Sequence, residues 1–367
     1  WSGSSLSSFA RLRHHHQRIP CHLIVCYYQK IYLRGLKNLV KPFAVFGIGS
    51  VLGMAQRRIF GKSLTVFCYH DVTNTPGDFS RENDLNVLPE VFDYQIGYIK
   101  KYFNVIEPKQ LMEKTLPSNA ALITFDDGFK SFFTNAIPVL EKHKTPVIIF
   151  LNMGPIRGEI FWSGLIVYLC GRRSDFIEYL KSHLQREEVE DPPFLSCSQV
   201  LVEGYLRQTN EDFHETVSRY VGEFTDESDL ERARHNPYVF YGNHTYTHFV
   251  SSLMSDEEFM TDVEKNSKLL RAYPNYLDYF AFPFGQPDRT FTEPQVQLLL
   301  DAGIKKVFSS ASSFNLQPLA PFLDRIALLS EDCSPAKIKF RVLKPWLTQS
   351  LKKGQYSVVS NSIVHPS

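Results

Sequence analysis

The sequence lacks an excess of either charge, and this absence argues against one class of partner. The chain of 367 residues carries 40 lysines and arginines against 39 aspartates and glutamates. Such a balanced chain has no overall electrostatic field that would attract nucleic acid. We therefore expect no nucleic-acid partner, and we expect specificity to come from a local site.

The sequence also lacks paired cysteine motifs. Its cysteines are scattered with no CxxC pair and no regular spacing, so neither a zinc knuckle nor a disulfide framework is predicted. Ordinary thiols of this kind, mostly buried, favour a reducing compartment. The six are Cys21, Cys26, Cys68, Cys170, Cys197 and Cys333.

The N-terminal region has no apolar run of the length that a membrane span requires. The uncharged stretch from Pro42 to Gln56 falls short of the roughly 20 residues needed to cross a bilayer core. Its basic flanks fit either a helix packed against the domain or a helix lying at a membrane surface. We expect residues 1–60 to form an extension that is partly disordered. No clear signal peptide is seen, which leaves the location open but favours the cytoplasm or a membrane surface over export.

Short apolar runs alternate with helical patterns from residue 62 onward. Runs such as SLTVFCY, ALITF and PVIIFL are separated by segments whose apolar residues recur at helical spacing. This alternation predicts parallel strands joined by crossover helices. It is interrupted at about 161–235, which we interpret as a helical insertion, and it then resumes. We therefore predict a (β/α) barrel over residues 61–345, followed by a tail over residues 346–367, with catalytic groups where strands end.

Three polar clusters follow predicted strands. They are Asp126 with Asp127, His244 with His248, and His70 with Asp71. Alone, an Asp-Asp-Gly sequence is also a common turn, and two histidines four residues apart are only suggestive. Together, one carboxylate and two imidazoles make a three-ligand set that leaves metal positions open for water and substrate. The second aspartate would then be free to act as a general base.

These motifs resemble those of a known family. The sequences TFDDG from Thr124, HTYTH from His244 and FPFG from Phe282 are similar to the first three signature motifs of the polysaccharide deacetylases, also called NodB-homology domains or carbohydrate esterase family 4. The resemblance runs in order over roughly residues 62 to 330, apart from the insertion. It implies a distorted (β/α)7 barrel of the NodB-like type that carries a helical insertion.

The resemblance also implies a reaction and a set of roles. The expected activity is hydrolysis of N-acetyl groups on amino sugars of a polysaccharide or oligosaccharide, with release of acetate. Asp127, His244 and His248 would bind a divalent ion, most often Zn²⁺. Asp126 would be the general base that activates water.

The third motif departs from the family pattern. It usually includes an arginine that steadies the base, and the stretch YFAFPFG has none. We hypothesise that Arg325 supplies this charge, whereas the alternative is a surface salt bridge with Asp324 or Asp332. Phe284 and Pro283 are candidates for binding or orienting the sugar, as is Phe282, with simple packing as the alternative.

The family's late leucine-x-histidine motif, which provides the general acid, is absent. The only histidine after His248 is His365 in the tail. In the branch of the family that deacetylates poly-N-acetylglucosamine, an early histidine in a stretch like CYHDV takes the acid role. The resemblance therefore implies that His70 protonates the departing amine, whereas the alternative is a histidine that only fixes its loop.

Two other functions are open at the level of sequence. An O-acetyl esterase acting on xylan or another ester would use the same metal and base. A catalytically silent glycan-binding relative would explain the missing arginine and late histidine. The expected partner is an N-acetylated glycan substrate, with a possible peripheral contact to a membrane, and the sequence does not predict an oligomeric state.

Overall fold

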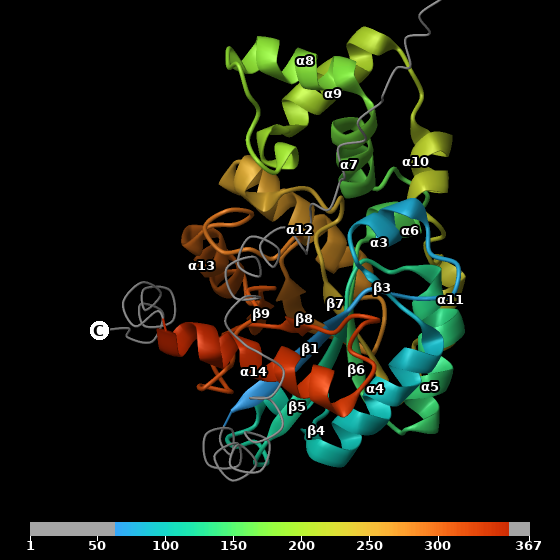
Figure 1. Cartoon of the computed structure of the whole chain (residues 1–367), viewed down its shortest axis with the longest axis vertical. Coiled ribbons are helices and arrows are strands. Elements are labelled where there is room, and N and C mark those ends of the chain that lie inside the picture. Colours follow the sequence, from blue (N-terminus) through green and yellow to red (C-terminus); the bar gives the residue numbers. More distant parts are fainter. Residues whose placement is uncertain (1–62, 352–367) are drawn as a thin grey trace, which may run out of the picture.

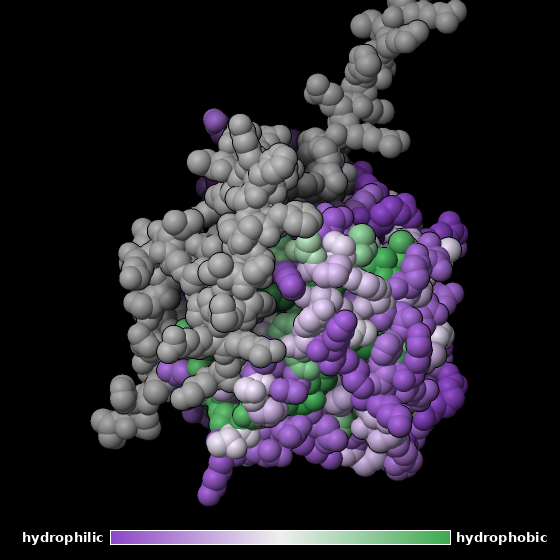
Figure 2. Space-filling view, turned by 60° about the horizontal axis from the view of Figure 1, so that its bottom comes forward, coloured by the Kyte–Doolittle hydropathy of each residue, from purple (hydrophilic) through white to green (hydrophobic). Residues whose placement is uncertain are grey.

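The computed structural model describes residues 63–351 (Figure 1). The predicted extension with its membrane-surface segment, and residues 352–367 of the predicted tail, lie outside the described residues. Within this part of the chain, no helix combines the length and the apolar character needed to cross a membrane. The face in Figure 2 is hydrophilic over most of its described surface, with apolar residues in small groups between.

A curled sheet lies at the centre of the described residues (Figure 1). Its nine strands are β1 (Leu64–Tyr69), β4 (Asn104–Val105), β5 (Ala120–Phe125), β6 (Val147–Leu151), β7 (Val239–Asn243), β8 (Tyr276–Ala281), β9 (Lys306–Phe308), β10 (Phe322–Leu323) and β11 (Ile326–Ala327). They follow the order β10-β9-β8-β7-β6-β5-β1-β11, and β4 pairs with β5 beside this path. Every pairing in this sheet is parallel. The predicted class, a distorted (β/α) barrel, is confirmed.

The central strands are apolar along their whole length because both of their faces are covered. β1, β5 and β6 are buried at every position. In the register of β1 and β5, Tyr69 lies opposite Phe125. The residues that follow these strands, His70 and Asp126, therefore leave the sheet side by side.

Helices and short helical turns connect the strands and cover the outside of the sheet. They are α3 (Asp78–Glu82), α4 (Pro89–Tyr102), η1 (Pro108–Met112), η2 (Phe132–Ala136), α5 (Ile137–Lys142), α6 (Met153–Ile156), η4 (Ser251–Leu253), α12 (Asp256–Leu270), α13 (Glu293–Asp301) and α14 (Pro335–Leu351). A separate pair of short parallel strands, β2 (Asp71–Val72) and β3 (Asn86–Val87), follows β1. Burial of the apolar faces of these helices against the sheet provides the main core.

A group of helices lies between β6 and β7, in the stretch interpreted as an insertion. These elements are α7 (Trp162–Arg172), α8 (Ser174–Leu184), η3 (Pro193–Ser196), α9 (Gln199–Thr209), α10 (His214–Val221) and α11 (Glu227–Ala233). α7, α8, α9 and α10 stand together at the top of Figure 1. Their buried residues form one hydrophobic cluster that also contains Phe249 and Val250, which follow β7. The helices therefore pack directly against the loop that carries His244 and His248. The limits of the insertion, 161–235, and of the barrel domain stay predictions.

Candidate active site

The ends of three strands bring the predicted polar residues together. Asp126 and Asp127 follow β5, His244 follows β7, and His70 follows β1. His248 lies in the loop after β7. All of these side chains except His70 are buried.

Asp127, His244 and His248 point their ligand atoms at one another. Nε2 of His248 lies 3.1 Å from Oδ1 of Asp127, and Nε2 of His244 lies 3.4 Å from the same oxygen. The two Nε2 atoms are 3.2 Å apart. One carboxylate oxygen and two imidazole nitrogens therefore face a common point.

The hydrogen bonds on the far side of each ring indicate where the ring protons are. Nδ1 of His244 lies 2.7 Å from the carbonyl oxygen of Ala281, which can only accept, so this nitrogen carries the proton. The hydroxyl of Ser163 donates to the carbonyl of His248 and therefore accepts from Nδ1 of the same histidine. Both Nε2 atoms then present lone pairs to Asp127.

This arrangement fits a divalent cation. Burial lowers the pKa of His248, which favours its neutral form. Oδ1 of Asp127 is a buried oxygen with no hydrogen-bond partner. Three lone-pair donors that face one another without a proton between them repel unless a cation lies among them. The fixed tautomers are those that metal-binding histidines adopt through their outer hydrogen bonds.

The backbone at this cluster adopts an uncommon conformation. Asp127, Thr245 and His248 have φ angles of 74°, 65° and 61°, in the left-handed region that residues other than glycine rarely adopt. Strain of this kind is usually retained at functional sites. Gly128, with φ of 96°, continues the turn after β5.

Buried polar side chains hold the loop after β7 in this shape. Oδ2 of Asp262, on α12, accepts hydrogen bonds from the backbone N–H groups of Tyr246 and Thr247 at 2.7 and 3.3 Å. Nδ2 of Asn152 donates to the carbonyls of His244 and Thr245. These contacts satisfy backbone groups that would otherwise be buried without partners.

Asp126 is paired with Arg325. Nη1 and Nη2 of the arginine lie 2.6 and 2.7 Å from the two carboxylate oxygens, in a bidentate arrangement. Burial raises the pKa of Asp126, but the charge and hydrogen bonds of Arg325, together with the neighbouring His244 and His70, outweigh it and hold this pKa below its usual value. Asp324, in contrast, accepts from Ser309, and Asp332 pairs with Arg341.

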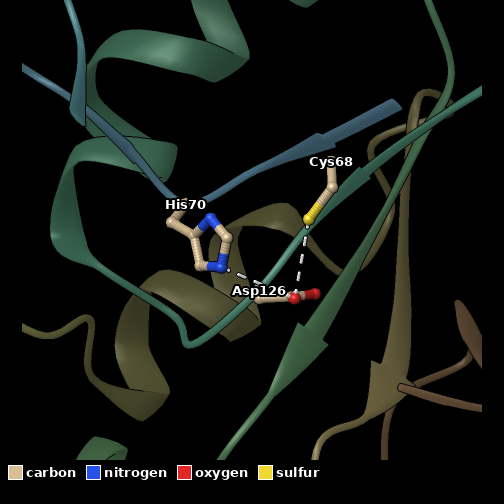
Figure 3. A group of neighbouring side chains, drawn as sticks. All are labelled: Cys68, His70 and Asp126. Carbon is tan, nitrogen blue, oxygen red and sulfur yellow. Dashed lines mark hydrogen bonds and ion pairs between the residues drawn. The ribbon is translucent and has the colours of Figure 1, made fainter. Parts of the chain in front are cut away.

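Figure 3 shows two further side chains beside Asp126. Nε2 of His70 and Sγ of Cys68 both lie 3.7 Å from Oδ2 of the aspartate. The side chain of His70 is 17% exposed, so it reaches both the buried carboxylate and the solvent. Burial raises the pKa of the Cys68 thiol, which keeps it a neutral donor.

The residues of the third motif have different surroundings. The ring of Phe284 stacks on Phe194 of η3 and lies 5.5 Å from the ring of His248. Pro283 is buried in the turn before it. Phe282 is fully buried and stacks on Phe291 in a core cluster, so the suggestion that it lines a sugar pocket is wrong.

Sequence reasoning missed two polar neighbours of the site. Cys68 was taken as an ordinary thiol, although it stands two residues before His70 and so on the same side of its strand. No motif or spacing in the sequence pointed to Ser163, because it lies 85 positions before His248 in the chain.

Comparisons with known proteins bear on the family and the fold of the chain. Residues 113–305 match the model of the family described as polysaccharide deacetylase. The fold is similar to that of deacetylase PplD from Streptococcus pyogenes, solved in complex with acetate, with 15% identity over 76% of this chain and 98% of that chain and a TM-score of 0.50. It is also similar to IcaB from Ammonifex degensii, with 18% identity over 77% of this chain and 98% of that chain and a TM-score of 0.50. A comparison with curated proteins found no match.

Proposed function

The chain belongs to the polysaccharide deacetylase family, and on this basis we propose that it is a metal-dependent hydrolase acting on N-acetylated amino sugars of a polysaccharide or oligosaccharide. The observation that carries the proposal is that two neighbouring aspartates have different surroundings. Asp127 faces two imidazole lone pairs, and Asp126 is kept charged beside it by an arginine. The products are acetate and a free amino sugar.

Asp127, His244 and His248 would hold the metal ion. Two imidazole nitrogens and one carboxylate oxygen are a donor set that zinc accepts in catalytic sites, where it keeps a position for water or substrate. Such an ion, when bound, supplies a Lewis acid that polarises the acetyl carbonyl and acidifies water. His244 and His248 are oriented for this by the carbonyl of Ala281 and the hydroxyl of Ser163.

Asp126 acts as the general base. Oδ2 of its carboxylate lies 3.9 Å from Nε2 of His244, so this oxygen is a neighbour of the three residues that would hold the metal and could accept a proton from a water there. Arg325 keeps the carboxylate ionised and fixes its plane. The base removes one proton from water as the water oxygen bonds to the acetyl carbon.

His70 acts as the general acid. Its Nε2 lies 3.7 Å from Oδ2 of Asp126, and its side chain is 17% exposed, so a sugar can reach it from the solvent. As the carbon–nitrogen bond breaks, the departing nitrogen takes a proton from Nε2 of His70 and leaves as an amine. An amide needs this step because an unprotonated amine anion is a very poor leaving group.

Phe284 is proposed to form part of the sugar-binding surface, since its ring lies at the metal-ligand histidine and is only partly buried. Pro283 would act only by shaping the turn that presents this ring. Arg325 orients the base and is too deeply buried to contact the sugar. In this proposal, Arg325 replaces the arginine that the third motif lacks, and His70 replaces the late histidine. The absence of those two residues was the reason to consider a silent relative.

Acetate release from defined glycans tests the proposal. The full chain is incubated with N-acetylglucosamine oligomers and, separately, with O-acetylated xylan oligomers, and the metal content of the same sample is measured. We expect acetate from the N-acetylated substrate, loss of the activity with a chelator and recovery with zinc. Release from the xylan oligomers alone would favour the esterase. Metal-loaded protein that releases no acetate would contradict the proposal.

A further inference from the structure

Two thiols of the helical insertion lie close enough to bond. Cys170, near the end of α7, and Cys197, directly after η3, place their Sγ atoms 3.6 Å apart. A disulfide has a sulfur–sulfur distance of about 2.05 Å, so the two atoms need to approach by only about 1.5 Å. We propose that Cys170 and Cys197 are an oxidation site that forms an intramolecular disulfide between α7 and η3.

The exposure of the two thiols sets the order of the reaction. Cys170 is partly exposed, whereas Cys197 is fully buried. An oxidant of the glutathione disulfide class therefore meets Cys170 first. The neighbouring Cys197 thiol and burial raise the pKa of Cys170, so the minor thiolate form attacks the oxidant, forms a mixed disulfide and releases one glutathione thiol. The thiolate of Cys197 then attacks the Cys170 sulfur and releases the second, so two protein thiols are oxidised and one glutathione disulfide is reduced.

The other thiols of residues 63–351 have different surroundings. Cys68 is buried beside Asp126 in the barrel, and Cys333 is exposed just before α14, with its sulfur 3.9 Å from Nζ of Lys337. Cys170 and Cys197 are the one pair in this part of the chain for which a sulfur–sulfur contact is found. Within residues 63–351, an intramolecular disulfide is therefore expected only in the insertion.

Both segments that the bond would join also pack against a proposed metal ligand. On α7, Ser163 bonds to the ring and the carbonyl of His248, and the preceding Phe161 has its ring 4.9 Å from the histidine ring. On η3, Phe194 stacks on Phe284 at 4.7 Å, and Phe284 in turn lies beside His248. A disulfide between α7 and η3 would therefore restrain the elements on two sides of His248 and slow the loss of its metal. This consequence rests on the proposed function, whereas formation of the bond does not.

Mass spectrometry of the full chain tests the bond itself. Protein in which Cys21, Cys26 and Cys333 are changed to serine is treated with oxidised glutathione, so that neither the thiols outside the described residues nor the exposed thiol of Cys333 can compete. We expect a loss of two hydrogens and a cross-linked peptide pair containing Cys170 and Cys197. Cys197→Ser should instead stop at a glutathione adduct on Cys170, and Cys170→Ser should not react in the insertion. Protein in the parent background that stays reduced, or stops at the adduct, would overturn the inference.

Thermal unfolding and metal release test the consequence. Closing a loop of this size by a disulfide is expected to raise the unfolding midpoint by roughly 5 to 10 °C, reversibly with dithiothreitol. Zinc should leave the oxidised protein at least about 3-fold more slowly in the presence of a chelator, a readout that needs no substrate. Equal release rates would contradict the coupling to His248. Protein that forms the bond and never binds zinc would contradict the proposed function and leave the oxidation site in place.

Discussion

The guanidinium of Arg325 lies against both oxygens of the Asp126 carboxylate, at 2.6 and 2.7 Å, and neither side chain is more than 3% exposed. The two residues are 199 positions apart in the chain. Arg325 lies in the chain between β10 and β11, and these two strands are the opposite ends of the strand order in the sheet. Asp126 follows β5. The proposed base is therefore held by a charge that comes from the last part of the barrel.

Replacing Arg325 with methionine should raise the pKa of Asp126, because burial then acts on the carboxylate without the opposing charge. In the wild type the lowered pKa keeps the base ionised down to acidic pH. The variant should therefore lose activity as pH falls at a higher pH than the wild type does. We expect kcat/KM near neutral pH to fall at least about 100-fold, measured as a pH profile.

The matched control for this variant is Arg341→Met. Arg341 is also buried and pairs with Asp332, away from the site. Both variants should lower the free energy of unfolding, by about 3 to 5 kcal/mol where a buried partner is left uncompensated. Only the change at Arg325 should move the acidic limb of the profile. An unmoved limb would mean that Arg325 does not tune the base.

His70→Asn should keep the metal and slow the hydrolysis of N-acetyl substrates by about 10² to 10⁴-fold, because the departing amine loses its proton donor. An aryl acetate has a leaving group that departs without protonation, so its hydrolysis should fall much less. Both rates are measured with the same metal-loaded protein. Equal losses on the two substrates would argue for the alternative, in which the histidine only fixes its loop.

Ser163→Ala should weaken metal binding, because the hydroxyl fixes the tautomer of the His248 ring. Loss of such an outer partner typically lowers metal affinity by about 10 to 100-fold. Ser196→Ala is a suitable control, since that serine is buried in the same insertion and accepts a hydrogen bond from the backbone of Glu190. Equal zinc affinities for the two variants, measured by competition with a chelator, would remove Ser163 from the site.

Gly128→Ala should destabilise the protein for two reasons. Its φ is 96°, and an added Cβ would lie 3.2 Å from Leu151 and 3.3 Å from Ile156. Gly158→Ala isolates the first reason, since Gly158 has φ of 85° and no neighbour within 4 Å. We expect a loss of about 1 kcal/mol for Gly158→Ala and a larger loss for Gly128→Ala in urea unfolding. Equal losses would show that the turn after β5 has room for a side chain.

The sequence was sufficient for the fold class and for the family. The alternation of apolar runs with helical patterns predicted parallel strands, and the ends of parallel strands meet at one edge, which is why residues distant in the chain could be grouped. The strands β10 and β11 were too short to show any alternation. Arg325 lies between these two strands, so the strand pattern could not place it beside Asp126. Its role was proposed only because the third motif lacks the arginine that usually steadies the base.

Other parts of the site depend on packing that no local pattern encodes. Ser163 reaches His248 only because the helices of the insertion share a hydrophobic cluster with the loop after β7. The approach of Cys170 to Cys197 likewise follows from the contact of α7 with η3. It could not be predicted from the sequence, because the spacing of the cysteines suggested no disulfide. Positive φ at Asp127 and His248 was not predicted either, because aspartate and histidine only tolerate this conformation better than most residues and the contacts of each loop decide where it occurs.

The central claim is a division of labour between the two neighbouring aspartates, and zinc content measured together with acetate release tests it most directly. Asp127→Asn and Asp126→Asn keep the size of each side chain and remove one charge. The account predicts that Asp127→Asn loses both bound zinc and turnover of N-acetylglucosamine oligomers, whereas Asp126→Asn keeps zinc at the wild-type level and loses turnover. Equal loss of zinc in both variants, or full turnover in Asp126→Asn, would contradict it.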